Sequence, residues 1–152
     1  IKNTYQKEKT NYSSSKDFNQ ELDKYIAVMT LDPMGLSQQE ADILSERLTS
    51  KLVVLKKYTV IERASVDKIM KEQKFQYSGC TNTQCAVEIG QLLNSNFIVI
   101  GSVSKFGATY SIDCRIINVE TSEILTSGSY SHKGDIDNLL HEGINSIANQ
   151  LY

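Results

Sequence analysis

Hydrophobic and polar positions along the chain follow two periods, and these periods predict the elements of an α/β domain. Apolar or alternating runs predict five strands, over residues 25–31, 58–63, 96–107, 108–121 and 123–132. Apolar residues at three- and four-residue spacing predict helices after Ser37, over residues 65–74 and 83–93, and from Asp135 onward.

These elements follow one another in the order β-α-β-α-α-β-β-β-α. The first strand, the long helix and the second strand form a right-handed crossover, which joins parallel strands. The last three strands are linked by tight turns and therefore form an antiparallel meander. The sequence thus predicts the α/β class, with a mixed sheet, helices packed on it and an antiparallel meander at one end.

Local signals predict where the elements begin. The "DPMG" segment breaks the first strand, and Ser37 with Glu40 forms a capping box for the helix that follows. The last helix carries a wide apolar stripe, and Gly143 within it permits a close approach to its neighbours.

Residues 1–22 differ in composition from the rest of the chain. They are polar, rich in Ser, Asn and Lys, and show no sustained periodicity, which predicts a flexible N-terminal segment. Because 152 residues fit one domain, we expect residues 23–152 to form a single α/β domain. The chain begins at Ile1 rather than Met, which indicates a mature or trimmed form.

Charge and hydropathy exclude several classes of protein. The net charge is −2 and the basic residues are scattered, which argues against a nucleic-acid partner. No run approaches the roughly 18 apolar residues that a membrane helix needs. Phosphate-binding glycine loops and the G-x-S-x-G elbow are both missing, and His132 and His141 have no catalytic companions. We therefore predict no catalytic set, no metal site and no cofactor.

One small-ligand pocket is nevertheless conceivable from the order of the elements. Asp32 follows the first strand and Glu62 ends the second. Ligands of α/β sheets bind beyond the carboxyl ends of parallel strands, where both carboxylates would lie. An aspartate before proline is also an ordinary turn opener, so the pattern permits a pocket without requiring one.

The three cysteines pose a separate question. A structural zinc site needs four ligands, and a redox dithiol favours two intervening residues rather than the four between Cys80 and Cys85. The turn-forming residues between them suit a small disulfide better, which would stabilise the fold by roughly 2 kcal/mol. Cys114 lies on the apolar face of a strand and is expected to be a buried free thiol. A stable disulfide favours an oxidising compartment.

Three stretches within residues 25–132 together resemble a known superfamily. They are "VIER…IMKEQ", "SGCTNTQCAVEIGQLL" and "IVIGSVSKFGATYSIDCRIINVETSEI". The chain is similar to the bacterial envelope superfamily of curli-secretion lipoproteins and lipoprotein activators of penicillin-binding proteins. It also looks like the amino-terminal domain of TolB.

This resemblance implies a non-enzymatic accessory domain in the periplasm or at the outer membrane. Its partner would be an envelope protein or a second copy, in envelope assembly, peptidoglycan-synthase regulation or secretion. Membrane attachment would come only from a lipid anchor upstream of Ile1. The predicted contact loop is Phe75, Gln76 and Tyr77, because it offers aromatic side chains beside the predicted disulfide. The alternatives are a ligand-binding domain using Asp32 and Glu62, and a subunit of a curli-type secretion ring.

Overall fold

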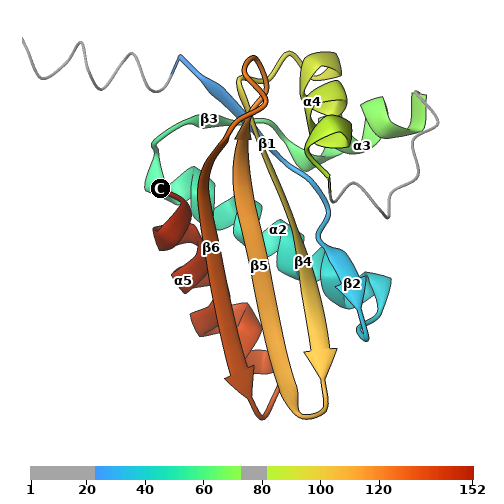
Figure 1. The fold of residues 1–152 in the computed structure, drawn as a ribbon, viewed down its shortest axis with the longest axis vertical. Coiled ribbons are helices and arrows are strands. Elements are labelled where there is room, and N and C mark those ends of the chain that lie inside the picture. The colour runs from blue at the N-terminus through green and yellow to red at the C-terminus, as the bar shows by residue number, and fades with distance from the viewer. Residues whose placement is uncertain (1–22, 73–81) are drawn as a thin grey trace, which may run out of the picture.

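The computed structural model describes residues 23–72 and 82–152, which form a six-stranded sheet with helices on both faces (Figure 1). This confirms the α/β class and the mixed sheet. The predicted flexible segment, residues 1–22, lies outside the described residues, so the division of the chain at residue 22 stays a prediction.

The sheet has the strand order β3-β1-β4-β5-β6, with β2 alongside β4. β1 pairs in parallel with both β3 and β4, as the predicted crossover requires. β4, β5 and β6 pair antiparallel, as the predicted meander requires (Figure 1). The strands are β1 Tyr25–Val28, β2 Asp32–Met34, β3 Thr59–Val60, β4 Phe97–Phe106, β5 Thr109–Asn118 and β6 Ile124–Lys133.

The first strand differs from its prediction. β1 ends at Val28, and the segment predicted to break the strand instead starts β2, in which Asp32 lies beside Ser102 of β4. Between the two strands the backbone leaves the ladder, and the Leu31 N–H donates to the buried Ser45 Oγ at 2.9 Å. Pro33 is accommodated because, among the described strands, β2 pairs with β4 alone and its other edge needs no donor.

Within the described residues four α-helices pack on the sheet, and two of them start at a side-chain cap. The predicted capping box is present, since the Glu40 N–H donates to Ser37 Oγ at 3.1 Å and the Ser37 N–H to Glu40 Oε1 at 3.1 Å. Asn82 caps a later helix by accepting the N–H of Cys85 at 2.8 Å. The helices are α2 Gln38–Leu55, α3 Arg63–Glu72, α4 Thr83–Leu92 and α5 Ile144–Leu151, the last preceded by a π-helical turn, η1 Leu139–Gly143.

The π-helical turn is the second departure from the predicted elements. Leu139 and Ile144 are both buried although they lie five residues apart, and the wider turn places both toward the core. The turn lies against β6, because a Cβ added to Gly143 would come 3.1 Å from the Tyr130 ring. The expected close approach at Gly143 is therefore confirmed.

Two hydrophobic cores lie on opposite faces of the sheet. The larger joins the sheet to α2 and α5, and the smaller joins it to α3 and α4 (Figure 1). Alternate residues of β4 serve the two cores, with Val99 in the larger and Ile98 in the smaller. Among the described helices, none has both the length and the apolarity needed to cross a membrane.

Candidate functional site

The cysteine prediction is tested only in part. Cys85 lies in the first turn of α4, whereas Cys80 lies outside the described residues, so the disulfide stays a prediction. Cys114 is a buried free thiol, as predicted. Burial, with a smaller contribution from the charge of Asp113, raises the pKa of the Cys114 thiol to about 12, which makes it unreactive in the folded protein.

The predicted contact loop, Phe75, Gln76 and Tyr77, lies outside the described residues. The two predicted pocket carboxylates are described. Asp32 opens β2, and the carbonyl of Glu62 accepts the N–H groups of Ser65 and Val66 at the start of α3. The structure records no contact between the two carboxylates, so their shared pocket stays a prediction.

A buried arginine occupies the position beyond the ends of the parallel strands. Arg63, the first residue of α3, is 9% exposed. Its Nη1 donates to the Val28 carbonyl at 3.2 Å and its Nη2 to Thr30 Oγ1 at 2.7 Å. The guanidinium thus ties α3 to the point where β1 leaves the sheet, and satisfies a carbonyl that the ladder does not reach.

A groove of about 470 Å³ opens beside this guanidinium. Arg63 Nε lies 3.5 Å from Glu46 Oε1 on α2, and that carboxylate side chain is 63% exposed. The groove brings together both signs of charge from α2 and α3, and neither Asp32 nor Glu62 lines it. Its lining residues are Thr30, Gln38, Asp42, Glu46, Arg63, Asp67 and Lys71.

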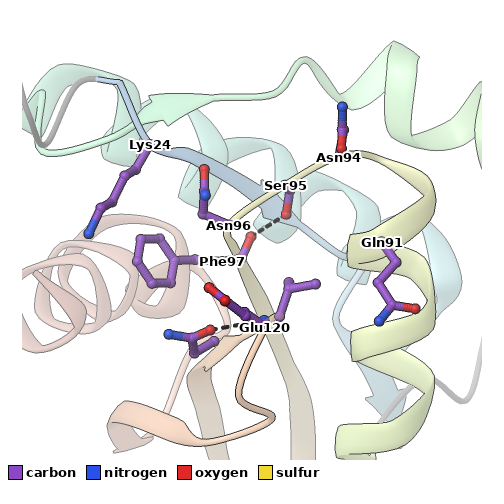
Figure 2. A pocket seen from close by; sticks show the side chains of 9 residues that line it. Lys24, Gln91, Asn94, Ser95, Asn96, Phe97 and Glu120 are labelled. Atoms are coloured by element: carbon purple, nitrogen blue, oxygen red, sulfur yellow. Dashed lines mark hydrogen bonds between the residues drawn. The ribbon is translucent and has the colours of Figure 1, made fainter.

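A second pocket, of about 350 Å³, lies at the start of β4, beside Phe97 (Figure 2). Its polar groups mainly hold the local backbone: Asn96 Oδ1 accepts the Tyr25 N–H at 2.8 Å, and Ser95 Oγ donates to the Phe97 carbonyl at 2.6 Å. Asn118 Oδ1 likewise accepts the Glu120 N–H at 2.9 Å. The Asn96 and Asn118 side chains therefore order the backbone at this end of the sheet.

The long antiparallel strands carry a polar face. On the side of the smaller core, alternate residues of β4, β5 and β6 beyond Ile100 are serines or charged and lie exposed or half-buried. In the part of the chain that the structure describes, α3 and α4 flank only one end of this face (Figure 1). Its residues are Ser102, Ser104, Ser111, Asp113, Arg115, Ser127, Ser129 and Ser131.

Two large apolar side chains lie on the same side of the sheet, at one end of this polar face. Phe106 is 89% exposed at the end of β4, and Met34 is 51% exposed on β2. Met34 pairs with Ser104, and residues two apart on a strand point the same way, so Met34, Ser104 and Phe106 share one face. We call Phe106 and Met34 the apolar pair.

Sequence reasoning missed Arg63 and the apolar pair. The sequence places Arg63 at the end of the predicted strand 58–63, whereas in the structure it starts α3. The signal available for Phe106 was its place before Gly107, in a turn where an apolar side chain has no core to enter. In the described ranges, no three His, Cys, Asp or Glu side chains gather as a metal site would require.

Solved structures share this fold at low sequence identity. The LpoB C-terminal domain from Salmonella enterica matches at 16% identity, covering 76% of this chain and 92% of that one, with a TM-score of 0.59. Lipoprotein GNA1162 from Neisseria meningitidis matches at 20% identity, covering 84% and 99%, with a TM-score of 0.59. The PelC dodecamer from Paraburkholderia phytofirmans matches at 13% identity, covering 86% and 89%, with a TM-score of 0.52.

The sequence itself matches a family. No curated protein matches the chain significantly. The family described as curli production assembly/transport component CsgG matches residues 4–111, well over half of the 152 residues. This confirms the suspected superfamily and its address, the bacterial cell envelope, in the periplasm or associated with the outer membrane. The chain therefore belongs to the CsgG family.

Proposed function

We propose that this domain is a non-enzymatic accessory module of the cell envelope that acts through protein–protein contacts. Its role would lie in envelope assembly, secretion or the regulation of peptidoglycan synthases. The observation that carries the proposal is the apolar pair, Phe106 and Met34, held in solvent at the end of the polar face. Family membership supports it, since the family is described as an assembly and transport component.

The apolar pair has the properties of an interface anchor. Both residues stand on paired strands, so the backbone that carries them is already ordered before a partner covers the side chains. Fully burying each would contribute roughly 1.5–3 kcal/mol. The hydroxyl groups of Ser104 and Ser111, which lie 2.6 Å apart, provide a polar rim. The partner that fits is an envelope protein with an apolar pocket surrounded by hydrogen-bonding groups.

Two further features from the sequence belong to this proposal. The loop of Phe75, Gln76 and Tyr77 is a second predicted contact, with the predicted Cys80–Cys85 disulfide beside it. A lipid anchor attached upstream of Ile1 would hold the domain at a membrane. The likeness to a protein named as a lipoprotein supports this attachment.

Two alternatives have their own support. Similarity to a dodecameric protein favours the first alternative, in which copies of this chain associate into a curli-type secretion ring. The small ligand predicted near Asp32 and Glu62 has weaker support, since a groove of about 470 Å³ lies beside the buried Arg63 but neither carboxylate lines it. A ligand bound at the two carboxylates would produce a saturable thermal shift that Asp32→Asn abolishes.

Site-specific cross-linking in cells tests the main proposal. A photoreactive phenylalanine analogue is placed at Phe106 and, as a matched control, at Val54, an apolar residue of α2 that is 68% exposed. We expect a cross-link to an envelope protein from position 106 only, and its loss when Met34→Ser is added. Cross-links to the chain itself would favour the ring. The same products from both positions, or none from position 106, would refute the contact.

A further inference from the structure

β6 is an edge strand, so one side of its backbone is not paired with another of the described strands. β5 is its only strand partner within the described residues. Ser129 lies opposite Asp113, and both its N–H and its carbonyl bond the Gln150 side chain rather than β5. In an antiparallel ladder, backbone groups alternate in direction. The groups of Ser127 and Ser131 therefore point outward from the sheet, as those of Ser129 do.

An exposed edge strand of this length normally has a feature that prevents another strand from pairing with it. Charged residues, proline or a bulge usually serve this purpose. The segment 124–131, "ILTSGSYS", contains neither charge nor proline, and its one irregularity lies near the start, opposite Ile116 and Ile117. The middle of the strand therefore depends on something outside the sheet for its protection.

Gln150 of α5 supplies that protection. Its Oε1 accepts the Ser129 N–H at 3.0 Å, and its Nε2 donates to the Ser129 carbonyl at 3.0 Å. A carboxamide held by two such bonds replaces the peptide group of a neighbouring strand. Gly128 makes the approach possible, because a Cβ there would come 3.0 Å from Gln150 Cβ. Ser146 Oγ accepts a second bond from Nε2 at 2.9 Å, which orients the amide.

We propose that β6 is a strand-addition surface that Gln150 keeps closed, and that the partner it accepts is the β6 edge of a second copy. This goes beyond the proposed function and uses neither Phe106 nor Met34. Once the carboxamide leaves, the backbone groups of Ser127, Ser129 and Ser131 face outward together. Two copies then pair in antiparallel fashion across a two-fold axis.

The register centred on Ser129 is self-complementary. Each Ser129 then faces its copy, and Ser127 faces Ser131, so outward-pointing groups meet outward-pointing groups. Tyr130 faces Gly128, which leaves room for the ring. Lys133 faces Leu125 rather than another lysine, so the pairing brings no like charges together.

The first test compares full-length Gln150→Ala with Asn149→Ala, a neighbouring exposed residue of the same helix. Amide hydrogen exchange at Ser129 is expected to accelerate by roughly fivefold to tenfold in Gln150→Ala, because one net hydrogen bond is lost. Sedimentation equilibrium is expected to show that Gln150→Ala doubles in mass as its concentration rises. Asn149→Ala is expected to match the wild type in both measurements.

A double variant identifies the surface. Ser129→Pro in the Gln150→Ala background removes an N–H that β5 does not use, and so blocks a new strand without breaking the ladder. Its mass is expected to return to that of the wild type. Unchanged exchange at Ser129 in Gln150→Ala would overturn the protective role. Faster exchange without a change in mass, or a dimer that persists in the double variant, would overturn strand addition at β6.

Discussion

The buried Arg63 guanidinium allows a quantitative test of how the parallel part of the sheet is held. Arg63→Met keeps most of the apolar stem and removes every donor. The Val28 carbonyl loses the partner that lies 3.2 Å away, and Thr30 Oγ1 loses the one at 2.7 Å. A hydrogen bond from a charged donor to a buried group contributes about 1.5–3 kcal/mol.

Two other effects modify this value. The ion pair with Glu46 adds little, since that carboxylate side chain is 63% exposed and such pairs contribute about 0–1 kcal/mol. Removing a buried charge also relieves its desolvation, which offsets part of the loss. We therefore expect Arg63→Met to lower the free energy of unfolding by about 2 kcal/mol.

Urea unfolding followed by circular dichroism measures the change. With a slope of about 1–2 kcal/mol per molar urea, the midpoint is expected to fall by about 1–2 M. Glu46→Gln is the control and is expected to change stability by less than about 0.5 kcal/mol. If Arg63→Met unfolds at the wild-type midpoint, the bonds to β1 do not stabilise the fold. If Glu46→Gln is equally destabilising, the ion pair dominates instead.

Three further predictions concern other parts of the domain. Gly101→Ala is expected to lower the free energy of unfolding by about 2–3 kcal/mol, measured by thermal unfolding, because the new Cβ would lie 2.2 Å from the Asp113 carbonyl oxygen. The cost of this overlap exceeds the stability usually gained when alanine replaces a glycine within a strand. Hydrogen bonds from Ser37, the backbone bond foremost, hold the pKa of Glu40 below its ordinary value of 4.5. The stability that this carboxylate contributes is present above pH 4.5 and is lost as pH falls through the lowered pKa. We therefore expect the free energy of unfolding, measured against pH, to change less over this acid range in Glu40→Gln than in the wild type. In a thiol-labelling assay at pH 8, we expect no labelling of Cys114 in the native protein. We expect one labelled thiol in the unfolded protein without reductant and three in the unfolded, reduced protein. Three labelled thiols in the unfolded protein without reductant would exclude the predicted disulfide.

Features specified by neighbouring residues were predictable from the sequence. The capping box at Ser37 and Glu40 needs only a spacing of three, and the meander needs only alternation and short turns. The π-helical turn was not predicted, because Leu140 and Ile144 also fit the ordinary spacing of four residues.

Features that depend on distant partners were not predictable in this way. Arg63 is buried because the Val28 carbonyl, 35 residues earlier, points toward it. β2 exists because Ser102 to Ser104 of a much later strand extend the ladder past the break in β1. The role of Gln150 depends on a glycine 22 residues earlier, on a strand whose edge the sequence does not identify.

The unequal size of the two cores has a consequence for how the domain opens. Among the residues that the structure describes, the core under α2 and α5 contains 18 buried residues, whereas the one under α3 and α4 contains 10. Local opening costs less where less apolar surface must be exposed, so we expect α3 and α4 to detach before the rest of the domain unfolds. Such an opening would expose Ile98 and Ile100 while the sheet, α2 and α5 remain folded. In that partly open form a largely hydrophobic strip of β4 would face solvent, at a free energy below that of global unfolding.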